Sequence, residues 1–482
     1  MRPRAPAACL GFATLLAGCA GLPSKPVPPS LPAAAPIAGL HSVRGRWPTP
    51  HWWRGYADPT LDRLIATALA SSPSLAVARA RFDSARQGVR IAAAASGAHV
   101  DLDGSIARQR LSDHGLIPPS LLGFSWYNQA NLGLQAHYTF DWWGKQRDAV
   151  EAAVDRTQAA QAERSAAALA LASAVADAYF GWQADQGRLA IARSEQRTAA
   201  RARVIAVARA HAGLAPATDV YRRDLDISAL GGRIAALEGS ARLRTVALAA
   251  LIGRSQAALP PLVARPLPVV AATMPSDVRI DLLARRPDIV ASRWRVEAAE
   301  RNSLAARAQF LPDISIDALA GLSSVGIGKL LQYGSRDPLA SVALHLPIFD
   351  AGMLRARYGV TRAQLRAAVA EYDATVIDAA REVATEAATL GAIGAQEAAR
   401  KRGVEAARKL YASAAARLRQ GLSDRRAELT AEMSLLDERD ALIELDSAAV
   451  SAHVALQQAL GGGYDGTPRV ANVEPIAGKA MP

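Results

Sequence analysis

The sequence predicts a mixed α and β membrane protein in which one structural unit occurs twice along the chain. Three observations lead to this fold class. Short motifs return in the same order about 210 residues later, four segments alternate between apolar and polar residues, and two proline-free stretches could form helices of roughly 100 Å. Half of the 482 residues are hydrophobic and 21% are charged, which excludes a disordered chain.

The charge balance gives little support to a nucleic-acid binder. Lys and Arg number 56 against 44 Asp and Glu, so the formal net charge is +12. Phosphate binding needs clustered basic side chains, whereas here they are spread among alanines and acidic residues, as on a solvated helix surface. A basic surface beside an anionic membrane is equally consistent with this composition.

The N-terminus has the layout of a secretory signal. Two arginines precede an apolar run at 5–17 that is too short to span a bilayer. The run ends in Leu16-Ala17-Gly18-Cys19, which resembles the bacterial lipobox. We therefore expect residues 1–18 to be a lipoprotein signal peptide and Cys19 to carry the acyl groups, palmitate included, that anchor the chain in lipid.

The residues after Cys19 predict a tether and a destination. From Gly21 to about Pro36 the chain is rich in Pro and Ala, which is typical of an extended linker. The residue after Cys19 is Ala20 rather than an aspartate. By resemblance to other bacterial lipoproteins, the absence of an aspartate there directs the product to the outer membrane. We expect a lipidated N-terminus and tether at 19–50.

Four landmarks indicate the internal repeat, because each recurs in the same order at a nearly constant offset. The pairs are Ser72-Pro73-Ser74 with Arg286-Pro287-Asp288, Phe140-Asp141 with Phe349-Asp350, Gly213-Leu214 with Gly421-Leu422, and Leu251-Ile252-Gly253 with Ala459-Leu460-Gly461. We expect repeats at 51–260 and 279–463, a linker at 261–278 and a C-terminal tail at 464–482.

Each repeat is expected to begin with an amphipathic helix. Apolar residues at spacings of three and four predict the first helix over about 58–95. Its second copy runs over about 280–309, with Pro287 near the beginning, where proline is tolerated.

The pattern then changes to a period of two, which predicts two strands in each repeat. Each strand has roughly ten residues, enough to cross a membrane in a tilted barrel. The apolar faces carry Val100, Leu102 and Ile106; Ala130, Leu132, Leu134, Ala136, Tyr138 and Phe140; Ile314, Ile316 and Ala318; and Val342, Leu344, Leu346 and Ile348. The polar faces carry Asp101, Asp103, Asn131, Gln135, His137, Ser315 and Asp317.

Two long helices follow, one in each repeat. The stretches 145–211 and 353–420 lack proline, and helices of this length must pack side by side as a coiled bundle. Gly213 and Gly421 are expected to end them in the left-handed conformation, and Pro216 to restart the chain in the first turn of the next helix. Two helical hairpins with tight turns result.

Four strands in one chain cannot close a barrel, and an open sheet edge in lipid leaves backbone groups without hydrogen bonds. The protein must therefore oligomerise. Two copies would give eight strands around a filled interior, whereas three would give twelve strands around a lumen.

The run Asp281-Leu282-Leu283-Ala284-Arg285-Arg286-Pro287-Asp288-Ile289, followed by Phe310-Leu311-Pro312, resembles the outer-membrane efflux protein family of TolC, OprM and NodT, most closely its lipoprotein branch. The similarity extends from about Trp52 to Gly461. It implies a homotrimer with a twelve-stranded outer-membrane β-barrel, four strands per protomer, continued by a long α-helical coiled-coil tunnel through the Gram-negative periplasm. It also implies a periplasmic adaptor (membrane fusion) protein and an inner-membrane pump, RND-type first, with MFS or ABC types as alternatives.

The resemblance assigns adaptor contact to the turns of the two hairpins. The residues are Gly213, Leu214, Ala215, Asp219, Val220, Gly421, Leu422 and Ser423. Family members often place an aspartate six residues after the second turn glycine, at an inner gate, but this chain has Ala427 there. We expect the neighbouring Arg425, Arg426 and Glu428 to form the gate instead.

The expected function is passive conduction of drugs or toxic small molecules across the outer membrane. Two alternatives stay open: a type I protein or peptide secretion channel coupled to an ABC transporter, and a structural coiled-coil envelope lipoprotein without a pore. We expect no enzymatic activity, cofactor or metal, because the sequence has no HExxH, GxSxG or CxxC pattern, and Gly326-Ile327-Gly328-Lys329 lacks the spacing of a phosphate loop.

Overall fold

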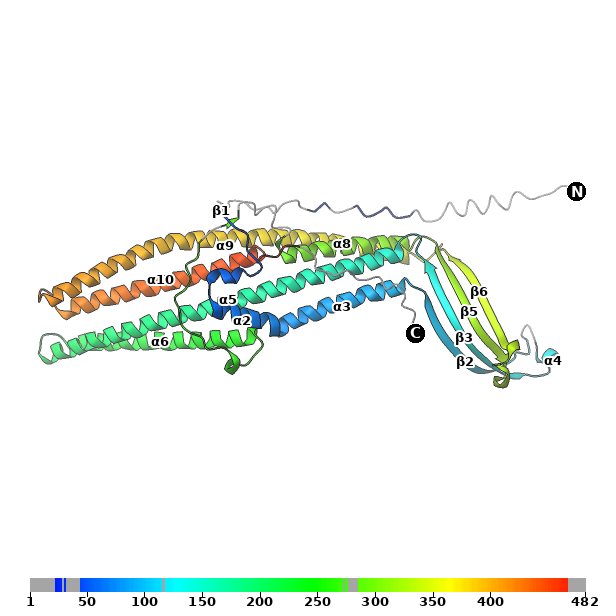
Figure 1. Ribbon diagram of the computed structural model, residues 1–482, viewed down its shortest axis with the longest axis horizontal. Coiled ribbons are helices and arrows are strands. Elements are labelled where there is room, and N and C mark those ends of the chain that lie inside the picture. Colours follow the sequence, from blue (N-terminus) through cyan, green and yellow to red (C-terminus); the bar gives the residue numbers. More distant parts are fainter. Residues whose placement is uncertain are drawn as a thin grey trace. The chain divides into compact units, whose positions relative to one another are not determined.

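The computed structural model describes residues 22–27, 30–31, 44–114, 118–271, 274–275 and 285–466. The chain divides into two compact units, each made of segments that are distant in the sequence. We call them the sheet unit, which includes Phe82–Ala159 and Ser292–Tyr372, and the helical unit, which includes Ala160–Ala291 and Asp373–Pro482 together with Pro32–Arg81. Figure 1 labels their elements.

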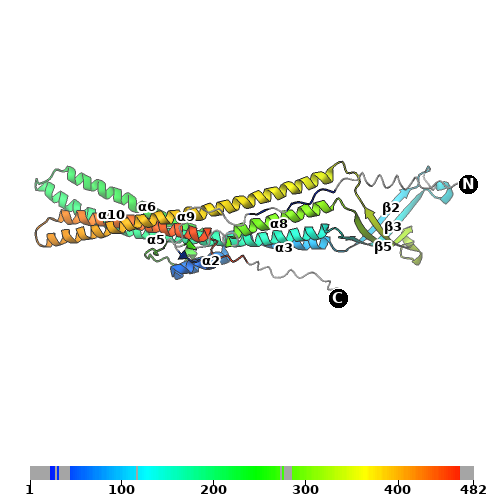
Figure 2. The same cartoon turned by 90° about the horizontal axis from the view of Figure 1, so that it is seen from above.

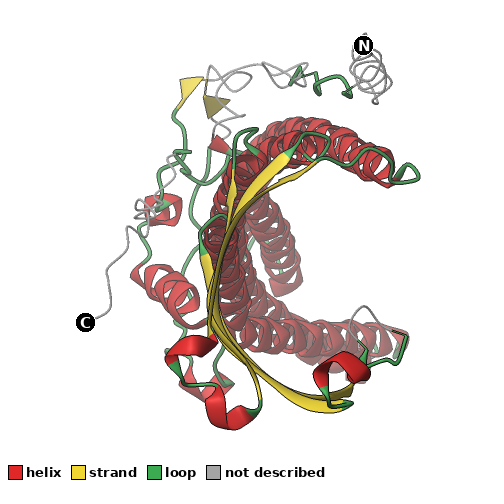
Figure 3. Ribbon diagram, turned by 90° about the vertical axis from the view of Figure 1, so that its right-hand side faces the viewer, coloured by secondary structure: helices red, strands yellow, loops and turns green. Residues whose placement is uncertain are grey.

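The sheet unit contains one antiparallel sheet with the strand order β2-β3-β5-β6. Its strands are β2 (His99–Arg110), β3 (Trp126–Phe140), β5 (Asp313–Val325) and β6 (Arg336–His345). Figure 3 shows them side by side in a curved sheet. The four predicted strands are therefore confirmed, and within the described residues β2 and β6 are the two edges of the sheet.

The polar residues of the strands share one face of this sheet. Asn131 is paired in the register with both Ser105 and Ser323, and its side chain hydrogen-bonds to theirs at 3.2 and 2.8 Å. His137 lies opposite Asp317, with 2.6 Å between its Nδ1 and the carboxylate. Since neighbouring residues in a strand point to opposite faces, the apolar rows occupy the other face.

The sheet unit also contains helical and short elements. The helix α8 (Pro287–Ala308) precedes β5, and most of its residues belong to this unit. The shorter elements are α4 (Pro119–Leu122), η3 (Ile327–Lys329) and η4 (Tyr333–Ser335).

The helical unit is built around two helical hairpins. The first joins α5 (Lys145–His211) to α6 (Thr218–Leu251), and the second joins α9 (Met353–Arg419) to α10 (Arg425–Ala459). Figures 1 and 2 both show the two turns at the same end of this unit. The beginnings of α5 and α9 belong to the sheet unit, so each of these helices contributes residues to both units.

The hydrophobic core of the helical unit lies where α2 (Pro59–Ser71) packs against the long helices. It combines residues from four separate stretches of chain. Among its members are Trp52, Trp53, Leu61, Leu64, Ile65, Val175, Tyr179, Phe180, Leu248, Ile252, Val450 and Val454. The short elements of this unit are η1 (Trp52–Tyr56), η2 (Gln256–Ala258) and the parallel pair β1 (Arg44–Gly45) and β4 (Met274–Pro275).

The helix expected over 58–95 is divided in two. It consists of α2 and α3 (Pro73–Ala95), separated at Ser72, because Pro73 has no N–H for the helical ladder and its ring crowds the preceding turn. Asp58 caps α2 by accepting hydrogen bonds from the Thr60 and Leu61 amides.

Three other boundaries differ from those expected. The strand β6 ends at His345, so Leu346 and Ile348 are outside it, because His345 pairs with Asp313, the first residue of β5, and the ladder ends there. The helix α6 begins at Thr218 rather than in a turn containing Pro216. The second copy of the opening helix is α8, which begins at Pro287, and residues 276–284 lie outside the described residues.

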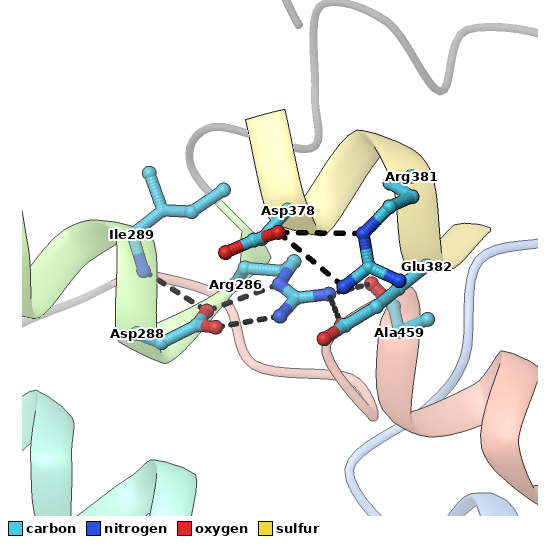
Figure 4. Close-up of polar contacts among 7 residues, drawn as sticks. All are labelled: Arg286, Asp288, Ile289, Asp378, Arg381, Glu382 and Ala459. Carbon is cyan, nitrogen blue, oxygen red and sulfur yellow. Dashed lines mark hydrogen bonds and ion pairs between the residues drawn. The ribbon is translucent and has the colours of Figure 1, made fainter. Parts of the chain in front are cut away.

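Arg286, from the motif that carries the family resemblance, clamps three parts of the helical unit together (Figure 4). Its guanidinium pairs with Asp288 and, at 2.7 Å, with Glu382 of α9, and it donates to the carbonyl of Ala459 at the end of α10. Only 7% of Arg286 is exposed, and its two ion pairs raise the pKa of the guanidinium despite the burial. This arginine therefore has a structural role.

Candidate functional site at the hairpin turns

The first hairpin turns at Gly213, which has a φ of +67°. The Gly213 amide donates to the Ala210 carbonyl at 3.1 Å, and the Leu214 amide donates to the Arg209 carbonyl at 2.8 Å. These two bonds define a Schellman motif, whose central residue is normally glycine because other side chains are strained at positive φ. Leu214 follows with 67% of its surface exposed.

The second hairpin turns in the same way at Gly421, whose φ is +70°. Its amide donates to the Leu418 carbonyl at 3.0 Å, and the Leu422 amide donates to the Arg417 carbonyl at 2.9 Å. Leu422 is 65% exposed. The predicted role of both glycines as helix terminators is therefore confirmed, and each turn presents a leucine to solvent.

The two turns differ in how the next helix begins. Ala217 precedes α6 without a side-chain cap, whereas Asp424 caps α10 and accepts bonds from the Arg426 and Ala427 amides at 3.0 and 3.2 Å. The Arg426 guanidinium also bonds to Asp424 and holds the pKa of that carboxyl below its usual range. This cap was not predicted, although an aspartate directly before a helical pattern is a recognised N-cap signal.

The three predicted gate residues interact within their own segment of the chain. Arg425 lies 3.7 Å from Glu428, one turn along α10, while Arg426 pairs with Asp424 at 2.6 Å. The Glu428 side chain is mostly shielded from solvent at 16% exposure, in contrast to both arginines. Their role as a gate stays a prediction.

A hollow of about 400 Å³ brings part of the predicted site together, and we call it the arginine hollow. Its lining includes Ala215 and Asp219 from the first hairpin and Arg426 from the second. Three further arginines of the first hairpin complete its basic lining, namely Arg209, Arg222 and Arg223. The remaining predicted contact residues, Gly213, Leu214, Val220, Gly421, Leu422 and Ser423, do not line it.

Ion pairs join the two hairpins along the helices, away from the turns themselves. Arg201 of α5 donates to both carboxylate oxygens of Glu432 on α10, at 2.6 and 2.7 Å. Farther from the turns, Arg188 of α5 pairs with Asp440 of α10 at 3.1 Å, and Arg233 of α6 pairs with Asp440 as well. These pairs could not be predicted, because no local spacing in the sequence relates residues on different helices.

One member of this network is a deeply buried acid. Glu195 is 1% exposed, and Arg233 reaches it at 2.9 Å. Burial raises the pKa of Glu195 and that of the neighbouring Asp437 on α10. Arg233 of α6 therefore holds the buried Glu195 carboxyl of α5 inside the bundle.

The predicted lipid anchor is Cys19. Cys19 lies outside the described residues, so its acylation stays a prediction. Within the described part of the chain, no helix combines the length and the apolarity needed to cross a membrane. The same residues contain no cluster of His, Cys, Asp or Glu suited to a metal ion.

Comparison with known proteins identifies clear relatives. The family model described as outer membrane efflux protein matches residues 64–254 and 279–462. The multidrug resistance outer membrane protein MdtP of Escherichia coli K12 is 33% identical over 471 residues, which is 96% of each chain. The outer membrane protein VceC of Vibrio cholerae has a crystal structure that matches with a TM-score of 0.78 and 31% identity, over 87% of this chain and all of that one. The outer-membrane channel OprN matches with a TM-score of 0.82 and 27% identity, over 92% and 99% of the two chains.

Proposed function

Because the chain belongs to the outer membrane efflux protein family, we propose that it is the outer-membrane channel of a tripartite efflux system. It conducts drugs or other toxic small molecules passively, with energy supplied by an inner-membrane pump. Relatives that cover nearly the whole chain are named multidrug resistance outer membrane proteins, which supports this cargo. Such transport requires a continuous lumen and a docking site rather than catalytic residues.

The observation that carries the proposal is the open sheet of the sheet unit. Within the described residues, β2 and β6 are edges, and the strands expose large apolar side chains such as Leu102 and Val342. In lipid, each unpaired backbone group costs several kcal/mol, so the edges must be covered. We propose that β6 of one copy pairs with β2 of the next.

The number of copies follows from the size of the interior. Eight strands leave space only for side chains, whereas twelve strands enclose a lumen. The polar face, with Asn131, His137 and Asp317, suits a water-filled interior. The proposal is therefore a homotrimer with a twelve-stranded barrel, in which the helical hairpins of the three copies form the periplasmic tunnel.

The hairpin turns are the proposed contact with a periplasmic adaptor. Both turns expose a leucine beside a sharply defined Schellman motif, so the same short surface is presented twice by each protomer. The inner-membrane pump reached through the adaptor is proposed to be of the RND type. Cys19 is proposed to add a lipid anchor, and Arg425, Arg426 and Glu428 to form the inner gate.

The proposal is tested by drug tolerance of a strain that depends on this channel. Gly213→Trp should lower tolerance toward that of the deletion strain, because a large side chain strains this positive-φ turn and blocks docking, while detergent-extracted trimers remain intact. Gly232→Trp is the matched control, since Gly232 is exposed on α6 with open space around its Cβ position. It should transport normally.

Two other results would redirect the proposal. A wild-type channel that forms trimers yet gives no drug tolerance would contradict efflux. Co-purification with an ABC exporter, together with loss of a secreted protein on deletion, would establish the type I secretion channel instead.

A further inference from the structure

We infer that the protein docking at the hairpin turns places acidic side chains in the arginine hollow. This inference rests on the proposed function, because it concerns the partner of the same turns. Its basis is the lining of the hollow, which holds four arginines and one aspartate; Asp226 and Asp424, which pair with Arg223 and Arg426, lie outside the lining.

Four arginines line the hollow, and they come from both hairpins. Arg209 belongs to α5, Arg222 and Arg223 to α6, and Arg426 to α10. Among the described residues of the lining, Asp219 supplies the single carboxylate. A volume of about 400 Å³ has room for side chains of another protein. The hollow is therefore preformed for an anionic group.

Two of these arginines, both on α6, make contacts within the chain that are exchangeable. Arg222 lies 3.5 Å from Asp219 with 76% of its side chain exposed, and Arg223 pairs with Asp226 at 3.0 Å with half of its side chain exposed. Exposed ion pairs of this kind contribute at most about 1 kcal/mol. An incoming carboxylate can replace them at little cost.

Arg209 connects the hollow to the turn itself. Its guanidinium donates to the carbonyl of Leu214 at 3.1 Å, a neutral acceptor that leaves the positive charge uncompensated in this contact. A partner that covers the exposed Leu214 side chain therefore comes close to this guanidinium. The Leu214 side chain and the Arg209 guanidinium therefore offer apolar contact and charge recognition at the same turn.

The surroundings extend the positive surface. Arg417 and Arg419 end α9, and Arg425 begins α10, so the second turn is also flanked by arginines. A neighbouring hollow of about 420 Å³ is lined by Arg197 and Arg201 against Glu432.

Guanidinium forks match carboxylates in a bidentate geometry, and a potential of one sign accelerates association with a partner of the opposite sign. The lining also includes Ala202, Ala206, Leu429 and Met433. This mixture of apolar and basic groups fits the acidic face of an amphipathic helix better than a lipid headgroup.

The test combines photo-crosslinking with charge reversal in intact cells. Benzoylphenylalanine replaces Leu214, and the cross-linked partner peptide is sequenced by mass spectrometry. The double variant Arg222→Glu, Arg426→Glu should lower the cross-linked fraction about tenfold, because like charges then face each other. The matched control is Arg242→Glu, Arg402→Glu, since both arginines are exposed on the same hairpins but do not line the hollow. It should cross-link as the parent does.

Charge exchange identifies the acidic residue directly. An Asp or Glu of the cross-linked peptide, changed to Arg, should restore cross-linking to the double Glu variant and weaken it with the parent. The milder pair Arg222→Gln, Arg426→Gln should give a smaller loss, and native electrophoresis verifies that each variant forms the parent oligomer.

The outcomes separate this inference from the proposed function. If the parent cross-links to no periplasmic protein, the adaptor contact itself is wrong. If a periplasmic protein is captured equally by the parent and by the double Glu variant, docking stands and acidic recognition is overturned. Cross-linking to anionic lipid alone would also overturn it.

Discussion

The sheet unit and the helical unit place their apolar side chains in opposite ways. In the sheet unit, Leu102 is 67% exposed and Ile106 is 69% exposed. In the helical unit, Leu61, Leu64 and Ile65 have no exposed surface. The helical unit therefore gains its stability from burial within its own core, whereas the sheet leaves its apolar face exposed, as the proposed membrane barrel requires.

Polar groups follow the reverse arrangement. The sheet holds polar side chains on an open face, where Asn131 and His137 bond to neighbouring strands. The helical unit instead encloses charged groups such as Arg286 and Glu195 between helices. Substitutions should therefore have different consequences in the two units.

The largest effect is expected for a charge on the apolar face of the sheet. Leu134→Arg should disfavour membrane insertion by about 2–4 kcal/mol if this position is near the middle of the bilayer. Leu134 is half exposed on β3, and Gln135→Arg on the opposite face is the matched control. Trimer yield in outer-membrane fractions measures the difference, and a loss confined to Gln135→Arg would show that the faces are reversed.

The second effect tests the enclosed charge of the helical unit. Arg286→Ala should lower the free energy of unfolding by about 2–3 kcal/mol, because Asp288, Glu382 and the Ala459 carbonyl lose their common partner. Denaturant unfolding of the detergent-purified protein measures it. The control is Arg381→Ala, which removes a pair with Asp378 whose side chains are both more than 60% exposed. Equal losses in the two variants would contradict the clamp.

A third variant tests whether enclosed charge is confined to the helical unit, because the sheet unit also contains a half-buried acid. Burial, reinforced by Glu297, raises the pKa of Asp155 in α5 to about 6. In the unfolded chain this carboxyl titrates near 4, so the folded state binds the proton more tightly. The contribution of Asp155 to the free energy of unfolding is therefore fully present below pH 4 and is lost as the pH rises through 6.

Asp155→Asn should therefore raise stability by about 1–2 kcal/mol at pH 7.5, after allowance for partial solvent screening, and give no gain at pH 4. Melting temperatures at the two pH values measure this. Asp83→Asn, at an exposed aspartate of the same unit, should change neither. A gain of the same size at both pH values would exclude the titration of Asp155 as its cause.

The smallest effect concerns the two hairpin turns. Asp424→Ala should cost about 1 kcal/mol locally, because the first turn of α10 loses its cap. Amide hydrogen exchange should become faster at Arg426 and Ala427, while α6, which has no side-chain cap, stays unchanged. Unchanged exchange in α10 would show that the cap is dispensable.

The sequence alone determined the elements whose cause is local. The periodicity and the absence of proline predicted α5 over 145–211, and the glycines predicted the left-handed turns at Gly213 and Gly421. Alternation predicted four strands and the residues on each face. These features depend on residues a few positions apart, so the sequence pattern contains the necessary information.

Only the tertiary structure decided which distant residues meet. It paired β3 with β5, joined Arg286 to Glu382 and Ala459, and assembled the arginine hollow from three helices. It also showed that Arg425 and Glu428 interact along α10. Such contacts depend on how long helices pack and on the register of remote strands, and no local spacing in a single sequence encodes either.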